Sequence, residues 1–119
     1  MGKFTVQQIR AAYKYNLKAG NGQIVATSPL FFSMEQCVEA IHWVCAHCGA
    51  PVEDSTMGEN LGAQIKYQIY FNDKGGICFR LLDEKGSVFL LAEGYTAKRS
   101  CKMGIQSVRN NAPDAPIIN

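Results

Sequence analysis

Two cysteines three positions apart, Cys45 and Cys48, are the residues best suited to chemistry, and His42 and His47 stand beside them. The Cys-x-x-Cys spacing can hold a zinc ion or form a dithiol that shuttles electrons. A closed zinc site needs four ligands, and the sequence has no second pair of this kind. A thiol- or metal-dependent protein that uses Cys45 and Cys48 is therefore an alternative whose ligand set is incomplete.

The helical phase around these cysteines favours a structural role. At about 100° per residue, Cys45 and Cys48 share the apolar face of a predicted helix with Ile41 and Val44. The pair also falls at the C-terminal end of this helix, where the helix dipole disfavours a thiolate. The chain has five cysteines, an odd number that cannot form a complete disulfide framework. We therefore expect reduced, buried thiols and neither a metal nor a cofactor.

The sequence contains no recognisable catalytic constellation. Nucleophilic hydrolysis needs a nucleophile, a base and an orienting group that converge on a pocket. The two histidines lie on one predicted helix, and the carboxylates fall mainly on helix surfaces or turns. No glycine loop leads from a strand into a helix, as a phosphate-binding loop would. The chain is therefore expected to be non-catalytic, and a binding or interaction domain is the leading function.

Two features offer a surface for a partner. The second predicted helix carries basic side chains along one arc: Lys98, Arg99, Lys102 and Arg109. An acidic partner or nucleic acid could meet this arc, but no aromatic residues are interleaved for base stacking, and a solvated helix face is the commoner role. Trp43 falls opposite the apolar face of the first helix. We expect the 51–63 segment to cover it; if it is exposed, it would anchor a protein partner or a second copy.

The composition fits one compact domain. The chain has 119 residues, of which 47% are hydrophobic, and a formal net charge of +2. A chain of this size can bury a core without metal or disulfide staples, and its charge is too small for a dedicated nucleic-acid binder. No apolar run approaches the roughly 18–20 residues of a membrane span, and no signal-peptide pattern follows Met1. We therefore expect a cytoplasmic protein without membrane contact.

An internal repeat organises the chain. With an offset of 64 residues and no gap, apolar residues fall on apolar residues and glycine falls on glycine. The matched pairs are Tyr15 and Phe79, Leu17 and Leu81, Gly22 and Gly86, Ile24 and Val88, Phe31 and Tyr95, Cys37 and Cys101, Ile41 and Ile105, and Val44 and Val108. The first copy spans about residues 3–51, the second about 66–116, and residues 52–65 link them within one domain, 1–119.

Each copy reads as three strands followed by a helix. Alternating apolar residues predict the strands, and Asn21-Gly22 predicts a tight primed turn between two of them. Ser33, with Gln36 as its reciprocal partner, and Thr96 are the expected helix N-caps. The tail after Pro116 is expected to be loose, although Ile117 and Ile118 could dock. The predicted fold is α+β, with two tandem βββα repeats that share one curved antiparallel sheet.

Two segments carry a family resemblance. The first is the strand-turn-strand segment 15–28, Tyr-Asn-Leu-Lys-Ala-Gly-Asn-Gly-Gln-Ile-Val-Ala-Thr-Ser. The second is the helix portion of the second copy, 93–98 followed by 104–113. These segments resemble the YegP-like family of small bacterial domains of unknown function, and the two copies cover nearly the whole chain. The resemblance implies two β(3)-α copies that share one curved sheet and exchange helices, and it implies no enzymatic activity.

The resemblance also bears on assembly. Two copies in one chain already complete the pseudo-dimer, which favours a monomer over a homodimer. The sequence departs from the family pattern at Leu30, which stands where the second copy has Gly94, and at 35–39, where Glu-Gln-Cys-Val-Glu replaces a basic helix opening. A role tied to a basic helix therefore belongs to the second copy. The best-preserved strands belong to the first copy, so we expect the second helix to pack on them.

Overall fold

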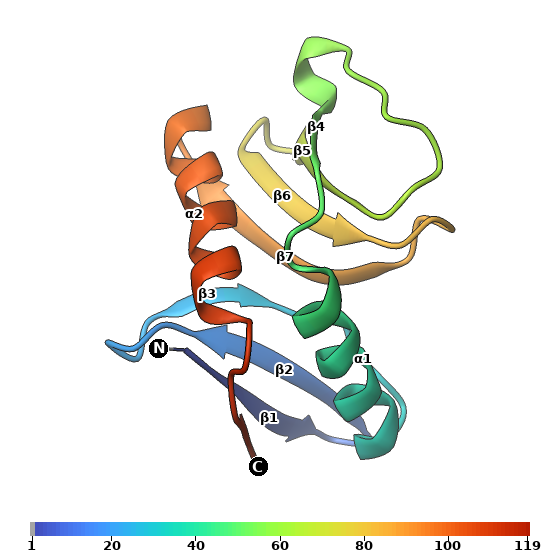
Figure 1. Ribbon diagram of the computed structural model, residues 1–119, viewed down its shortest axis with the longest axis vertical. Coiled ribbons are helices and arrows are strands. Elements are labelled where there is room, and N and C mark those ends of the chain that lie inside the picture. Colours follow the sequence, from blue (N-terminus) through green and yellow to red (C-terminus); the bar gives the residue numbers. More distant parts are fainter. Residues whose placement is uncertain (1) are drawn as a thin grey trace.

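The computed structural model describes residues 2–119 and contains one eight-stranded sheet with two helices on the same face (Figure 1). The strand order is β4-β5-β6-β7-β3-β2-β1-β8. The first repeat consists of β1 (Lys3–Ile9), β2 (Ala12–Lys18), β3 (Ile24–Thr27) and α1 (Met34–His47). The second consists of β5 (Lys66–Phe71), β6 (Ile77–Leu82), β7 (Val88–Tyr95) and α2 (Lys98–Asn111). The predicted α+β fold with two tandem repeats is thus confirmed.

The two halves of the sheet meet between β3 and β7, where Thr27 pairs with Leu91. These residues are themselves 64 positions apart, so the pseudo-twofold axis that relates the repeats passes through this pair. Pro29 follows β3 closely, and a proline lacks the N–H that would extend the pairing. The counterpart of Pro29 is Glu93, which lies within β7. Consequently β3 has four residues, β7 has eight, and the junction is short.

Two strands outside the predicted repeats lengthen the sheet. The linker begins with β4 (Val52–Asp54), which pairs in parallel with β5, and a short 3-10 helix, η1 (Ser55–Met57), follows. The tail contains β8 (Ile117–Ile118), which pairs in parallel with β1. Each of these strands follows the helix of one repeat and joins the sheet of the other. The sheet is therefore mixed rather than purely antiparallel, and the tail after Pro116 is docked.

Equivalent backbone hydrogen bonds hold the two segments that cross from one repeat to the other. The Phe4 amide donates to the Pro116 carbonyl at 2.9 Å, and the Tyr67 amide donates to the Pro51 carbonyl at 2.8 Å. The helices are shared rather than fully exchanged, because α2 packs against β2 and β3 of the first repeat and also against β6 and β7 of the second. Helix α1 likewise contacts β2 and β7. The expected packing of α2 on the strands of the first repeat is thus observed, but α2 also packs on the strands of its own repeat.

Three hairpin loops share the same pattern of backbone hydrogen bonds. In the first, the Ala19 amide donates to the Gln23 carbonyl and the Gly22 amide donates to the Ala19 carbonyl, both at 2.9 Å. The same two bonds recur in the loops 72–76 and 83–87. Gly22 has φ +85°, while Asn21 is not among the residues with positive φ. The primed two-residue turn expected at Asn21-Gly22 is therefore wrong, and a three-residue loop that ends in a left-handed glycine replaces it.

The two helices begin differently. The Ser33 hydroxyl accepts from the Gln36 amide at 3.1 Å, as predicted, while the Gln36 side chain accepts from the Phe32 amide at 3.1 Å. Helix α2 begins after Ala97, and no side chain caps it. The expected Thr96 cap is wrong by one residue. The first turn of α2 therefore lacks the hydroxyl partner that stabilises α1.

Matched aromatic triads form the centre of each half. In both, the first strand supplies an edge-on ring, the second strand a central ring, and the segment before the helix a stacked ring. The triads are Phe4, Tyr15 and Phe31 in the first repeat and Tyr67, Phe79 and Tyr95 in the second. The stacked pairs have centroid separations of 5.8 and 6.1 Å. Burial of these rings against both helices is a principal source of the stability of the fold.

One difference between the triads explains a glycine in α2. Tyr95 occupies the place of Phe31, and its hydroxyl points at Gly104, where the first repeat has Ala40. A Cβ at Gly104 would overlap this hydroxyl and would lie 2.8 Å from Cζ of Tyr95 and 3.1 Å from Cε2 of Phe79. The phenol and the missing methyl group are therefore a matched pair, as Phe31 and Ala40 are in the first repeat.

Glu53 on β4 closes the loop that joins the repeats. Its side chain is buried and accepts hydrogen bonds from Lys66 Nζ at 2.8 Å, from the Leu61 amide at 2.7 Å and from Gln68 Nε2 at 2.8 Å. Lys66 also donates to the Gly62 carbonyl at 2.8 Å. The hydrogen bond from Lys66 is the main reason why the pKa of Glu53 falls from about 4.5 to about 2. The charged carboxylate therefore ties β4, β5 and the loop together.

We predict that Gly104→Ala destabilises the protein by about 1–2 kcal/mol, because the overlap with Tyr95 exceeds the gain in helix propensity. The same substitution should cost clearly less in a Tyr95→Phe background, which recreates the Phe31 and Ala40 combination. Chemical denaturation of the four variants of this double-mutant cycle measures the coupling. An equal cost in both backgrounds would contradict the matched pair.

We predict that the contribution of Glu53 to stability disappears on acidification. Its pKa is lower in the folded chain, so the contribution is complete above about pH 4.5 and is lost as the pH falls toward 2. Glu53→Gln should therefore lower stability at pH 7 and flatten its pH dependence between these values. Glu84→Gln, in an exposed hairpin loop, is the control; equal behaviour of both variants would refute the role of Glu53.

Candidate functional site

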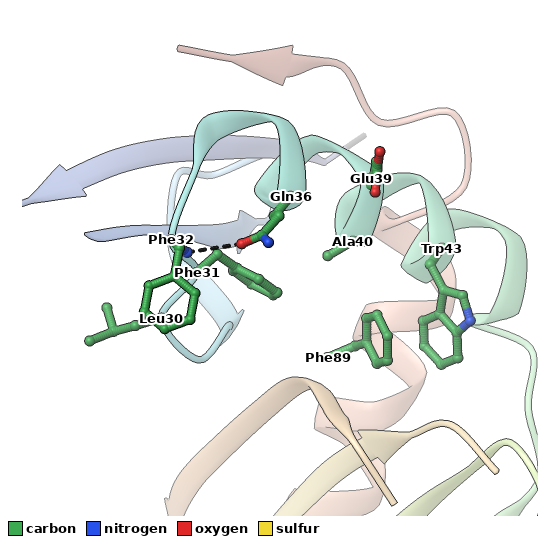
Figure 2. Close-up of a pocket in the computed structure, with 8 residues that line it drawn as sticks. All are labelled: Leu30, Phe31, Phe32, Gln36, Glu39, Ala40, Trp43 and Phe89. Atoms are coloured by element: carbon green, nitrogen blue, oxygen red, sulfur yellow. Dashed lines mark hydrogen bonds between the residues drawn. The ribbon is translucent and has the colours of Figure 1, made fainter. Parts of the chain in front are cut away.

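An apolar groove of about 540 Å³ lies between the start of α1, the loop before it and β7. Figure 2 shows its walls: the loop residues on one side, helix side chains above, and a stacked pair of rings at the far end. The residues that line it are Leu30, Phe31, Phe32, Gln36, Glu39, Ala40, Trp43 and Phe89. Both repeats contribute, because Phe89 belongs to β7 and the other residues belong to the first repeat. We call this feature the aromatic groove.

Trp43 stacks on Phe89, with the two ring centroids 4.0 Å apart and an angle of 19° between the rings. On the helix side, the imidazole of His47 lies 4.5 Å from the Trp43 ring. His47 Nδ1 is 2.8 Å from the Trp43 carbonyl oxygen, which fixes the imidazole one helical turn away. Phe89 from the other repeat supports the indole, a contact that the sequence did not indicate when it suggested cover by residues 51–63. Trp43 remains partly exposed at the end of the groove.

The loop before α1 is held firmly, although its outer side chains are free. The Ser28 hydroxyl accepts from the Tyr15 amide at 2.9 Å and donates to the Pro29 carbonyl at 2.7 Å. Phe31 and Tyr13 exchange both backbone hydrogen bonds, at 2.7 and 2.9 Å. Leu30 is nevertheless 61% exposed and Phe32 is 90% exposed. A rigid backbone thus presents two apolar side chains to solvent at the mouth of the groove.

The second repeat serves as an internal control for these residues. At the positions 64 residues away, Gly94 corresponds to Leu30, Thr96 to Phe32 and Ser107 to Trp43. Phe89 is itself the counterpart of Val25. The second repeat therefore folds with small or polar residues in place of Leu30, Phe32 and Trp43. The fold does not require apolar residues at these three positions of the aromatic groove.

The basic residues predicted as a partner surface have different surroundings. Lys98 forms an ion pair with the buried Asp54, with 3.2 Å between Nζ and Oδ2. Arg109 donates to the Ala50 carbonyl at 2.6 Å and lies over the ring of Tyr67. Lys102 is exposed and, with Arg109, lines a second groove of about 540 Å³. The walls of this groove contain both charged and apolar residues. This second groove is lined by Val52, Asp54, Met57, Glu59, Lys102, Ile105, Gln106 and Arg109.

The basic arc is therefore divided. Lys98 holds Asp54 of the linker to α2, and Arg109 holds the Ala50 carbonyl and the Tyr67 ring, whereas Arg99 and Lys102 are exposed. Carboxylates at Asp54 and Glu59 stand among the cations of the second groove. Trp43 lies in the aromatic groove and not beside these residues. The predicted partner residues thus belong to separate places on the molecule.

The thiols at Cys45 and Cys48 point into the protein. The Cys45 thiol donates to the Ala112 carbonyl at 3.3 Å, and Cys48 is buried at the end of α1. Burial raises the pKa of both thiols, and the same cause raises the pKa of Cys37, Cys78 and Cys101. Within residues 2–119, no three His, Cys, Asp or Glu side chains are grouped so that they could hold a metal ion. The charge of Arg109 favours a thiolate at Cys48, but burial has the larger effect on its pKa.

Sequence reasoning identified Trp43 but missed Leu30, Phe32 and Phe89 as parts of one site. A signal was present in the run Leu30-Phe31-Phe32, which stands between Pro29 and the helix cap at Ser33. Only the middle residue of this run has an apolar counterpart in the second repeat, Tyr95. Its two neighbours therefore had no assigned place in the core.

The fold and the groove define a tandem-repeat α+β domain with an apolar surface of its own. The sequence profile of the family described as "Domain of unknown function (DUF1508)" matches residues 11–54 and 72–119, one segment in each repeat. The chain belongs to this family, which confirms the resemblance to YegP-like proteins. No biochemical activity accompanies that description.

Relatives of two lengths resemble the chain. The UPF0339 protein of Methanosarcina acetivorans is 40% identical over 53 residues, which are 44% of this chain and 91% of that protein. The UPF0339 protein YegP of Yersinia pestis is 26% identical over 112 residues, 93% of this chain and 88% of that protein. The solution structure of yegP from E. coli, a protein of unknown function, has a TM-score of 0.78 at 21% identity and covers 98% of this chain and 90% of that one. The last similarity shows the shared fold.

Neither helix, nor any other in residues 2–119, has the length and apolar character needed to cross a membrane.

We predict that the thiols of the folded protein react slowly with a thiol-labelling reagent at neutral pH, because burial both blocks access and raises each pKa. Unfolding in denaturant should expose all five to fast labelling. The measurement is a time course of labelling with and without denaturant. A native thiol that reacts rapidly below pH 7 would contradict this prediction and would favour thiol chemistry at Cys45 and Cys48.

Proposed function

We propose that this chain is a non-catalytic interaction module that binds a partner protein through the aromatic groove. The partner would insert an aliphatic or aromatic side chain between the Leu30 and Phe32 side of the groove and the Trp43 and Phe89 pair. The rigid loop pre-organises these residues, so little conformational entropy is lost on binding. Tryptophan and other aromatic residues are also enriched at the energetic centres of protein interfaces.

The observation that carries this proposal is the asymmetry between the repeats. The same fold is built in the second repeat with Gly94, Thr96 and Ser107 at the matching positions. Scattered exposed apolar residues are ordinary on protein surfaces, but here two of them, Leu30 and Phe32, line one groove. Three partly exposed rings, those of Phe31, Trp43 and Phe89, line the same groove. A concave apolar surface that the fold does not require favours binding over a structural role.

The other functions weighed from the sequence have less support. Thiol or metal chemistry would need an accessible thiolate, whereas burial raises the pKa of Cys45 and Cys48. Nucleic-acid binding would need a continuous basic surface, whereas Lys98 is paired with Asp54 and the second groove contains carboxylates. A protein partner at the aromatic groove requires neither an accessible thiolate nor a continuous basic surface.

We predict that peptides selected from a random displayed library against the intact chain bind at the aromatic groove. Phe32→Ala should lower the affinity for the selected peptides by about tenfold or more, since loss of a central interface aromatic residue commonly costs over about 1.4 kcal/mol of binding free energy. Fluorescence of Trp43, the single tryptophan of the chain, should change on binding. Titration of labelled peptides by fluorescence anisotropy gives the affinities.

The matched control is Phe71→Ala. Phe71 is 55% exposed on β5 and does not line the groove, so its removal deletes the same side chain from another surface. Both variants should keep the stability of the parent chain within a narrow range, because Phe32 is 90% exposed. Equal binding of the peptides to Phe32→Ala and Phe71→Ala, or selection of no peptide at all, would refute the proposed function.

A further inference from the structure

The aromatic groove lies in a part of the chain whose charges are all of one sign. Residues 19–65 contain no lysine or arginine, although they make up over a third of the sequence. The charged residues in this stretch are Glu35, Glu39, Glu53, Asp54 and Glu59. The net charge of +2 for the whole chain conceals this negative segment, because the basic residues lie on either side of it.

Two of these carboxylates, Glu39 in the wall of the groove and Glu35 one helical turn before it, are not neutralised. Glu53 is neutralised by Lys66, and Asp54 by Lys98. Glu35 and Glu39 are exposed, form no ion pair in residues 2–119, and stand four positions apart on one face of α1. Glu39 lines the groove, and Figure 2 shows it on the helix between Gln36 and Trp43.

The sign of this charge selects among partners for an apolar groove. Nucleic acids and anionic membrane surfaces are repelled by uncompensated carboxylates and are attracted by lysine and arginine. A protein segment that carries lysine or arginine next to its apolar anchor is attracted instead. Attraction of this kind raises the association rate and suppresses binding of acidic competitors.

We propose that the occupant of the aromatic groove is a cationic segment of another protein, with an apolar anchor in the groove and a lysine or arginine facing Glu39 and Glu35. This inference rests on the proposed function, since it specifies the partner of the same site. Glu39 and Glu35 are specificity-determining residues in this arrangement, while the rings of Trp43 and Phe89 supply the apolar contact. The second repeat has Met103 and Arg99 at the matching helix positions, so it does not share the preference.

Two matched displayed libraries test the charge preference. Both carry random residues at the same positions, and the fixed positions between them are lysine and arginine in one library and aspartate and glutamate in the other. Binders from the basic library should depend on Phe32 and bind at least about tenfold more tightly at low salt than the best acidic binders. Their advantage should shrink in 0.5 M salt, because exposed charge pairs are screened.

A charge-reversal variant separates this inference from the proposed function. Glu35→Lys/Glu39→Lys should reverse the preference, whereas Asp73→Lys/Glu84→Lys, the same change in net charge on exposed hairpin loops, should leave it intact. If both libraries yield Phe32-dependent binders of equal affinity, the groove remains a binding site and the cationic preference is overturned. If no binder from either library depends on Phe32, the proposed function fails as well. Binding to anionic vesicles that depends on Phe32 would also overturn the cationic partner.

Discussion

The fold depends on joining two three-stranded halves whose sheets meet through one residue pair, Thr27 and Leu91. So short a junction offers few backbone hydrogen bonds, and Pro29 prevents its extension. The halves are held instead by elements that cross between them. Both helices cover strands of both repeats, and the strand after each helix pairs with the other repeat. Because these elements connect the two halves, the two repeats should fold as one unit.

The pseudo-twofold arrangement also separates what the fold needs from what the chain has added. The aromatic triads, the glycine loops and the strand crossings recur in both halves. Against this common background, Leu30, Phe32, Trp43 and Glu39 are peculiar to the first repeat. The second repeat has the same fold without these four residues, so the outer part of the groove and its acidic helix face are additions made in the first repeat.

Much of the fold could be predicted because its signals are local. The offset of 64 residues aligned Phe31 with Tyr95, and alternation gave the six main strands. The strands β4 and β8 were missed because two or three residues cannot show a period, and the edges that they join belong to the other repeat. The groove was missed for the same reason. Trp43 was recognised, but its partner Phe89 comes from the other repeat, and no local pattern relates α1 to β7.

The most direct test of the proposed binding mode is a two-dimensional NMR titration of the intact, isotopically labelled chain with a selected basic peptide. The proposed binding mode predicts that the largest changes in amide chemical shift occur at residues 30–32, 36–43 and 89, on both sides of the pseudo-twofold axis. It also predicts that the exposed face of α2 is unaffected. Shifts that concentrate at Arg99, Lys102 and Arg109 while the aromatic groove stays unchanged would contradict it.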